Sequence, residues 1–428
     1  MIKKLNEKKL KVLVLVCDLN KGGVQRTAQN FADGFKEIGH ESRLMAVNEG
    51  GSREKDLKKI DVKYWIRLNK KNLKELKEWM PDILILQDCG IKHNQIKLLK
   101  ELLSKTIFIE QNTFSIPSKW QNLLDYSFQM TNWCAWKYKR SLKSNHKIVQ
   151  VLPYPIKISN FYPENKSIVK DLKKELNIPI NNLVIGRIGQ SNEGKWSKLL
   201  IKTFNSISLI FKDLNLVLVN PPNKIITQVN QSRFRKNIIL IDKVIGDENL
   251  RKIYSMFDVF ALVADQGESF GHVLAESMLC EVPSVVLSTP WFDNSQVEVV
   301  GHMKGGLVAL SSRGFQSALI EILRNKKLRL NLGKNARGKI INEYSHDKIC
   351  TELINKITNN NYHKNSGSSK KIINIYSNAF EKPNILTVVL LLSIFNLSFT
   401  RVTSGYQTII DYLKRLLKIL IYKLKKFK

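Results

Sequence analysis

Short apolar runs alternate with amphipathic stretches along the first third of the chain. The run from Lys11 to Cys17 predicts a buried strand, and the stretch from Val24 to Ile38 predicts a helix with one apolar face. Further strands are expected at Ser42–Val47, Asp82–Leu86, Thr106–Glu110 and Lys147–Val151. Strands that are buried on both faces and separated by helices predict a parallel sheet in an α/β domain.

The same alternation starts again after a segment that contains Pro153, Pro155 and Pro163, which we interpret as a linker. Strands are then expected at Leu183–Ile188, Leu214–Val219, Ile238–Ile241, Val259–Ala264 and Ser284–Leu287, and helices at Lys198–Phe211, Asn249–Met256, Val273–Met278 and Gln316–Glu343. We therefore predict two Rossmann-like α/β domains with parallel sheets, residues 1–165 and 166–362. They should face a cleft at the carboxyl ends of their strands.

The last region, residues 363–428, differs in character from both predicted domains. It is rich in Lys and Arg and poor in acidic residues, and from Tyr406 to Lys428 apolar side chains recur at helical spacing. This pattern is typical of a basic amphipathic helix that lies on an anionic membrane surface. The apolar run Ile385–Phe399 is shorter than the about 20 residues that span a bilayer. The alternative is a helix that packs onto the protein or onto a partner.

The charge of the whole chain is unusual. The 428 residues carry 69 Lys and Arg against 37 Asp and Glu, which gives a formal net charge of +32. Such an excess favours polyanionic partners, although a general bias toward Lys would produce the same figure. The sequence has no helix-turn-helix and no aromatic RNA-binding strand, so a nucleic-acid-binding protein is the weaker alternative.

Cysteines and histidines give no sign of a metal site. The five cysteines are scattered without a C-x-x-C pair, and no H-x-x-x-H or D-x-D spacing occurs. We therefore expect no disulfide framework, no zinc site and no carboxylate site for Mg²⁺ or Mn²⁺, and a reducing compartment fits. The apolar run Val12–Val16 is too short for the core of a secretory signal.

A glycine-rich segment follows the predicted strand Leu183–Ile188. Residues Gly189 to Lys195 fit the pattern G-x-x-x-x-G-K, which is typical of a phosphate-binding P-loop. However, Trp196 stands where a P-loop has the Ser or Thr that holds Mg²⁺. A nucleoside triphosphatase therefore remains a minor alternative.

Two carboxylates bracket the predicted start of a helix in the segment from Glu268 to Glu276. Gly271 lets the backbone approach a ligand closely, and the helix start favours phosphate. Carboxylates are suited to accept hydrogen bonds from sugar hydroxyls. Glutamates near a helix start are also common on ordinary surface helices, so the spacing alone does not decide.

The chain resembles retaining glycosyltransferases of family 4, which have the two-domain GT-B fold. The resemblance rests on Gly22-Gly23-Val24-Gln25-Arg26, on Gly186 to Lys195, and on the E-x7-E element from Glu268 to Glu276. It covers roughly residues 10–345. The resemblance implies that the loop at Gly22 and Gly23 faces the donor diphosphate and that Lys195 neutralises it. Glu276 would hold the ribose, and Glu268 would contact the donor sugar beside the backbone of Ser269, Phe270 and Gly271.

The chain departs from the family pattern in two places. The basic pair of the family has Arg where this chain has Gln190, and Arg187 compensates only if its side chain points the right way. The histidine often found near the end of a first-domain strand is replaced by Gln87-Asp88 or Glu110-Gln111. Either departure would affect catalysis or acceptor handling and leave the fold unchanged.

The sequence thus predicts a GT-B glycosyltransferase of the EC 2.4 class, with Glu268 and Lys195 as catalytic residues and no cofactor or metal. Its donor would be a nucleoside-diphosphate sugar, and its acceptor a saccharide or lipid-linked saccharide for a surface polysaccharide or glycolipid. We expect a cytoplasmic enzyme, peripheral on an anionic membrane through the tail. The enzymatic alternative is a sugar-nucleotide epimerase or phosphorylase of the same architecture.

Overall fold

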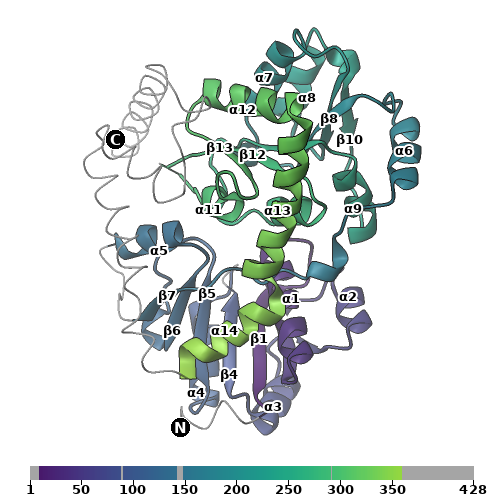
Figure 1. Cartoon of the computed structure of the whole chain (residues 1–428). Helices are drawn as coiled ribbons and strands as arrows, with labels where there is room; N and C mark the ends of the chain where they lie inside the picture. Colours follow the sequence, from purple (N-terminus) through teal and green to yellow (C-terminus); the bar gives the residue numbers. More distant parts are fainter. Residues whose placement is uncertain (1–8, 88–89, 142–147, 291, 359–428) are drawn as a thin grey trace. The chain divides into compact units, whose positions relative to one another are not determined.

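The structure is a computed structural model, and it describes residues 9–87, 90–141, 148–290 and 292–358. The chain forms two compact units (Figure 1). The first contains the residues up to Lys157 and resumes at Glu343, and the second runs from Ile158 to Asn342. The predicted tail, residues 363–428, lies outside the described residues. Within the described part of the chain, no helix is long and apolar enough to cross a membrane.

The first unit contains a seven-stranded parallel sheet in the order β3-β2-β1-β4-β5-β6-β7. The strands are β1 (Lys11–Asp18), β2 (Glu41–Glu49), β3 (Lys63–Ile66), β4 (Ile83–Gln87), β5 (Ile107–Asn112), β6 (Tyr126–Gln129) and β7 (Val149–Val151). The helices are α1 (Gly23–Glu37), α2 (Glu54–Lys59), α3 (Lys70–Trp79), α4 (His93–Leu102), α5 (Asn132–Lys139) and α14 (His346–Thr358).

Alternate residues of β1 enter two different hydrophobic cores, as the period of two in a strand requires. Val12, Val14 and Val16 pack on the face covered by α1 and α14. Leu13 and Leu15 belong to the core on the other face, which includes side chains of α3 and α4. Both faces of the sheet are therefore buried, which explains why its central strands have continuous apolar sequences.

The second unit contains a six-stranded parallel sheet in the order β10-β9-β8-β11-β12-β13. Its strands are β8 (Leu183–Ile188), β9 (Leu214–Val219), β10 (Ile238–Ile241), β11 (Val259–Leu262), β12 (Ser284–Leu287) and β13 (Gly306–Ala309). Its helices are α6 (Lys166–Glu175), α7 (Leu199–Ile207), α8 (Asn223–Asn230), α9 (Asp247–Ser255), α10 (His272–Leu279), α11 (Gln296–Val300) and α12 (Ser312–Arg324). Helix α13 (Lys326–Tyr344) leads back toward the first unit.

The predicted α/β class and the two parallel sheets are confirmed, and several details differ. The sequence analysis did not predict β3, β6 or β13, and the helical stretch Gln316–Glu343 is part of two helices that are separated at Asn325. The chain also returns to the first unit at Glu343, before the predicted domain limit at 362, because α14 packs its apolar face against α1.

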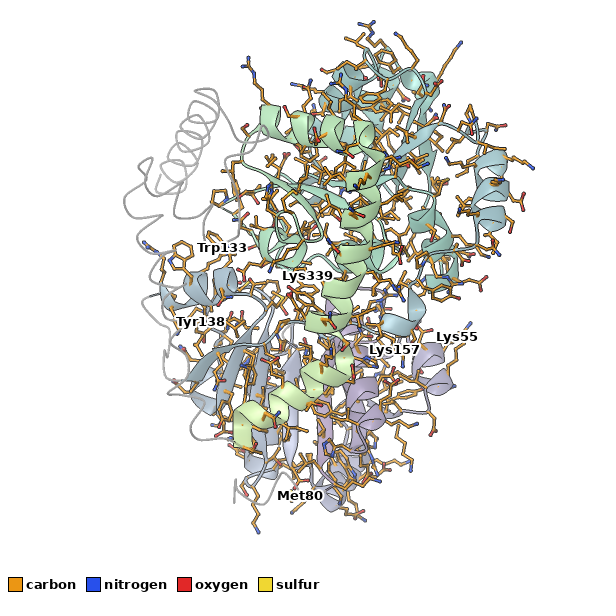
Figure 2. The ribbon with its side chains drawn as sticks, viewed as in Figure 1. Lys55, Met80, Trp133, Tyr138, Lys157 and Lys339 are labelled. Atoms are coloured by element: carbon orange, nitrogen blue, oxygen red, sulfur yellow. The ribbon has the colours of Figure 1, made fainter. Side chains whose placement is uncertain are left out.

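The aromatic stretch around α5 is a packing element. Trp120, Trp133 and Trp136 are buried, and the rings of Trp133 and Trp136 lie 4.7 Å apart. Figure 2 labels Trp133 and Tyr138 on α5. These buried tryptophans therefore contribute to the packing of the first unit.

The cysteines are a further point of difference. Cys134, Cys280 and Cys350 are buried free thiols. Cys17, at the end of β1, is disulfide-bonded, which the sequence analysis did not predict.

Candidate functional site

The predicted donor-binding segments lie at the point where the strand order of the second sheet reverses. β8 and β11 are neighbours in this sheet although they are distant in sequence. The loop after β8 contains Gly189 to Lys195, and the loop after β11 contains Asp265 to Gly271. Ligands of open parallel sheets bind outside the carboxyl ends of the strands at such a reversal.

The two predicted catalytic side chains are in direct contact. Lys195 Nζ lies 2.9 Å from Glu268 Oε2 and donates a second, longer hydrogen bond to the carbonyl of Gly267 at 3.4 Å. The Lys195 side chain is 28% exposed and that of Glu268 is 11% exposed. The ion pair is therefore partly open to solvent, and its ammonium group has a third proton to donate.

Glycines allow the two loops to approach each other and the following loop. Gly267 has φ +67°, and a Cβ there would lie 1.8 Å from the carbonyl oxygen of Asp293. A Cβ at Gly194 would lie 2.4 Å from the side chain of Gln266. Only glycine fits at position 267, whereas a side chain at position 194 would have to displace the exposed end of Gln266. These glycines allow the loops that contain Lys195 and Glu268 to approach each other.

Helix α10 begins at the end of this loop. Gly271, its N-cap, has the left-handed φ of +91° and supplies no side-chain cap, and the first turn contains no acidic residue. Ser269 is half-buried, whereas Phe270 is buried. The positive end of the helix therefore meets no carboxylate of its own first turn, which suits an anionic ligand.

Glu276 lies in the second turn of α10 and is 6% exposed. Its Oε2 accepts a hydrogen bond of 2.9 Å from the hydroxyl of Tyr254 on α9. The carboxylate is thus oriented by a neighbouring helix. Tyr254 was not noticed in the sequence, because no local pattern connects residues 254 and 276.

Gln190, in the loop after β8, and Arg187, in β8 itself, differ in exposure. Gln190 is exposed, and its carbonyl accepts a hydrogen bond of 2.8 Å from Trp196 Nε1. Arg187 is fully buried, and it donates to the carbonyls of Ile188 and Lys195, each at 2.6 Å. Burial lowers the pKa of Arg187, and the charge of Glu268 opposes that shift. A second cation therefore lies directly beneath the loop that carries Lys195.

The geometry of this loop does not favour the P-loop alternative. Glu193–Lys195 form a short 3-10 turn, Trp196 is extended and buried, and α7 begins only at Leu199. A P-loop leads directly into a helix whose first residues hold Mg²⁺. Here an indole occupies that place.

Gly22 and Gly23 belong to the first unit. Gly22 is the N-cap of α1 in extended conformation, and Gly23 is the first residue of the helix, after β1. Because the order of the first sheet reverses between β1 and β4, these glycines lie at the corresponding reversal of that sheet.

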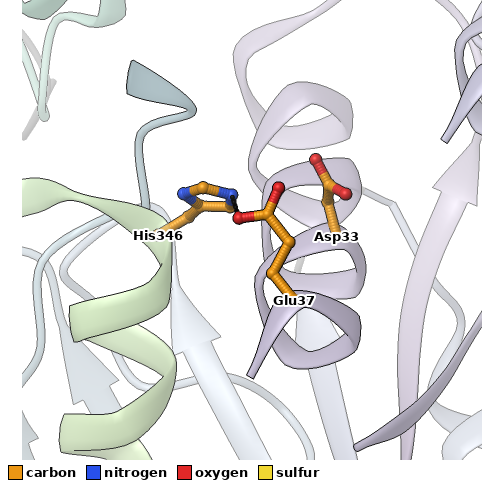
Figure 3. A group of neighbouring side chains, drawn as sticks. All are labelled: Asp33, Glu37 and His346. Atoms are coloured by element: carbon orange, nitrogen blue, oxygen red, sulfur yellow. Dashed lines mark ion pairs between the residues drawn. The ribbon is translucent and has the colours of Figure 1, made fainter. Parts of the chain in front are cut away.

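One cluster in the first unit has the composition of a metal site. Asp33 and Glu37 of α1 lie beside His346 of α14, with their ligand atoms within 4.8 Å of one another (Figure 3). Lys157 Nζ lies 2.6 Å from Asp33 Oδ2 and also contacts Glu37, and His346 Nε2 lies 2.8 Å from Glu37 Oε2. The ammonium group supplies the positive charge that a metal ion would bring.

The pKa shift of Lys157 agrees with an ion pair between its ammonium group and the two carboxylates. Burial lowers the pKa of Lys157, but the hydrogen bonds and charges of Asp33 and Glu37 outweigh it, so the pKa is raised. Burial lowers the pKa of His346. We therefore interpret the cluster as a structural connection among α1, α14 and the segment that leads to the second unit.

Comparison with known proteins identifies the second unit. Residues 169–339 match the family model of the glycosyl transferases group 1. The chain carries a group 1 glycosyltransferase domain. This domain includes Arg187, Lys195, Glu268 and Glu276, whereas Gly22 and Gly23 lie outside the matched residues.

Two relatives match about half of this chain. N-acetyl-alpha-D-glucosaminyl L-malate synthase of Bacillus anthracis is 23% identical over 239 residues, which are 54% of this chain and 60% of that protein. Lipid-A-disaccharide synthase of Sulfurihydrogenibium is 25% identical over 232 residues, which are 49% of this chain and 53% of that protein. The chain thus spans little more than half the length of these relatives.

The fold resemblance extends over both units. HepE of Anabaena, solved in complex with UDP-glucose, superposes with a TM-score of 0.66 and 13% identity. The superposition covers 82% of this chain and 99% of that one. The architecture is therefore that of the GT-B glycosyltransferases.

Proposed function

We propose that this protein transfers a hexose-type sugar from a nucleoside-diphosphate sugar to a saccharide or lipid-linked saccharide, with retention of the anomeric configuration. The proposal is supported by the group 1 domain and by the UDP-glucose bound to HepE. One observation carries it: the Lys195–Glu268 ion pair at the reversal of the second sheet, beside the start of α10. This arrangement combines a cation and a helix start for phosphate with a carboxylate for hydroxyl groups.

Each site residue has a role in this proposal. Lys195 and the backbone at Ser269, Phe270 and Gly271 neutralise the diphosphate, whose negative charge grows as it leaves. Glu276 holds the ribose and Glu268 contacts the donor sugar. Gly22 and Gly23 face the diphosphate from the first unit. Arg187 takes the place of the second basic residue, so Gln190 is not required for charge.

The same proposal requires no metal. Lys195, Arg187 and the start of α10 provide the positive charge that Mg²⁺ or Mn²⁺ provides elsewhere. Transfer should therefore continue unchanged in EDTA. Complete inactivation by EDTA and recovery with Mg²⁺ would contradict this part of the proposal.

We further propose that the enzyme acts in the synthesis of a polysaccharide, glycolipid or lipopolysaccharide at the cytoplasmic face of a membrane. The name of one relative, lipid-A-disaccharide synthase, supports a lipid-linked acceptor. The basic sequence from Tyr406 to Lys428 supports binding to anionic lipid. A chain truncated after Asn361 should no longer float with anionic vesicles. If it floats as well as the full chain, the tail is not the anchor.

The central experiment measures transfer of labelled sugar from a panel of UDP-, GDP-, ADP- and dTDP-sugars to added saccharide acceptors. A preceding thermal-shift screen with the nucleoside diphosphates selects the base, since a ligand at 100 times its Kd stabilises by about 2.7 kcal/mol. Glu268→Gln is the inactive control. Conversion of the donor without any acceptor indicates the epimerase alternative, and phosphate-dependent cleavage indicates a phosphorylase.

A further inference from the structure

Gln296, the first residue of α11, is fully buried and connects two loops of the second unit. Its Oε1 accepts a hydrogen bond of 3.2 Å from the backbone N–H of Glu268. Its Nε2 donates to the carbonyl of Leu287 at 3.0 Å and to Thr289 Oγ1 at 2.8 Å. One side-chain amide therefore joins the loop after β11 to the end of β12 and the loop that follows it.

The backbone around Glu268 is held from the same side. The N–H of Ser295 donates to the carbonyl of Glu268 at 3.0 Å, and the N–H of Asp293 donates to the carbonyl of Gln266 at 3.1 Å. With Gln296, both backbone polar groups of Glu268 are bonded to residues 295 and 296. The carboxylate of Glu268 is thus the part of this residue that is left to face a ligand, together with Lys195.

The amide at position 296 does more than fill space. An apolar side chain of the same size would leave the buried N–H of Glu268 without that acceptor, and buried donors without acceptors are strongly disfavoured. Gln is suited to this place because it offers an acceptor on one side and two donors on the other. The position of the Glu268 backbone therefore depends on one side chain that lies 28 residues away in sequence.

We propose that Gln296 is a positioning residue for Glu268. It fixes the backbone from which the Glu268 carboxylate reaches the donor sugar and pairs with Lys195, and it touches no ligand itself. The expected effect of Gln296 on sugar transfer rests on the proposed function. The expected effect of Gln296 on the backbone of the loop that contains Glu268 does not. The two effects can therefore be tested separately.

The test uses the full-length chain with Gln296→Met, which keeps the volume and removes the amide. Asn215→Leu is the matched control, because Asn215 is a buried amide of β9 in the same unit whose partners are Asn182 and Asn237. Hydrogen exchange is measured on the peptide from residue 265 to 274. We expect faster exchange in Gln296→Met and unchanged exchange in the control, since only the first variant loses the acceptor for Glu268 N–H.

The kinetic arm measures kcat for transfer and the Kd of the nucleoside diphosphate that wild type binds. In Gln296→Met, kcat should fall about tenfold while Kd changes less than about threefold, because Lys195 still meets the diphosphate. In a Glu268→Asp background the same change should reduce kcat less than about twofold further, since Glu268 is already displaced. Should Gln296→Met fail to fold, Thr289→Val removes one anchor of the amide and should give a smaller change in the same direction.

The outcomes separate the two claims. Unchanged exchange of the 265–274 peptide in Gln296→Met, or an equal loss of kcat in Asn215→Leu, overturns the positioning role. Faster exchange in Gln296→Met, together with a wild type that transfers no sugar and binds no nucleoside diphosphate, supports the contact and removes the proposed function.

Discussion

The carboxyl edges of the two sheets differ sharply in chemistry. In the second unit, the edge at β8 and β11 presents Lys195 and Glu268 above the buried Arg187. In the first unit, the ends of β4, β5 and β6 are dominated by buried neutral amides, which are Gln87, Gln111, Asn112 and Gln129. Both sheets are parallel and reverse their order in the same way.

Three of these amides, Gln111, Asn112 and Gln129, donate hydrogen bonds within the first unit. Gln111 Nε2 donates to the carbonyl of Leu152 at 3.1 Å, and Gln129 Nε2 donates to Ser127 Oγ at 3.2 Å. In the same unit, burial and the charge of Glu110 raise the pKa of Tyr138 on α5 to about 12. The same kind of sheet therefore gathers polar residues at its carboxyl edge in both units, while the side chains there differ in charge.

Glu268→Gln should have the largest effect and would sharpen the contrast between charged and neutral edges. The change keeps the size of the side chain and removes the carboxylate proposed to contact the sugar, so kcat should fall by about 10²-fold or more. Binding of the nucleoside diphosphate should stay equal or tighten, because Lys195 loses a competing anion. Calorimetry and a labelled-sugar assay measure the two quantities. Weaker binding together with near-normal turnover would reverse the proposed roles.

Lys195→Ala should weaken binding of the nucleoside diphosphate by about tenfold or more, since a hydrogen bond to a charged group contributes roughly 1.5–3 kcal/mol. Titration calorimetry at two salt concentrations provides the measurement. Lys198→Ala is the matched control, because Lys198 is an exposed lysine three residues further along the chain. Equal affinities of wild type and Lys195→Ala would remove Lys195 from the site.

Gln111→Leu tests the neutral edge. It leaves the carbonyl of Leu152 without this donor, so the free energy of unfolding should fall by about 1–3 kcal/mol. Affinity for the nucleoside diphosphate should change less than about twofold, because the charged site belongs to the other unit. Denaturant unfolding and calorimetry on the same preparation give both values. A large loss of affinity without a loss of stability would show that the amide edge serves the donor.

Gln190→Arg should have the smallest effect. Arg187 already supplies a second cation beneath the loop, so an added exposed guanidinium should tighten binding by about threefold at most. The same titration compares this variant with Gln190→Ala. A folded variant with strongly reduced affinity would reveal a specific role for the Gln190 amide.

The sequence predicted the architecture because the signal was local. Strands such as Leu183–Ile188 and Leu214–Val219 are continuous apolar runs, and the structure has them at the same bounds. β3 and β6 were missed because Lys63–Ile66 and Tyr126–Gln129 are only four residues long and mix polar with apolar side chains. Helix α14 was assigned to the second domain because its partner, α1, lies more than 300 residues earlier.

The site was predictable only in part, because only some of its residues belong to a local sequence motif. Glu268, Gly271 and Glu276 form one continuous motif, so their types and spacing could be recognised. The contacts that orient them come from Lys195, Tyr254 and Gln296, which are distant in sequence, and no local pattern connects these residues to the motif. The direction of Arg187 depends on rings of Trp196 and Phe260, whose centres lie 5.0 and 5.8 Å from the guanidinium.

The return of the chain at Glu343 has a consequence for the order of synthesis and folding. Helix α14 completes the core of the first unit, where Ile349 and Leu353 pack with Phe31 and Phe35. A ribosome delivers the chain from its N-terminus, so this core lacks one side until the residues up to 358 have emerged. The described residues of the second unit form one continuous stretch, which ends earlier, at residue 342. The part of the protein that is synthesised first is therefore the part that finishes folding last.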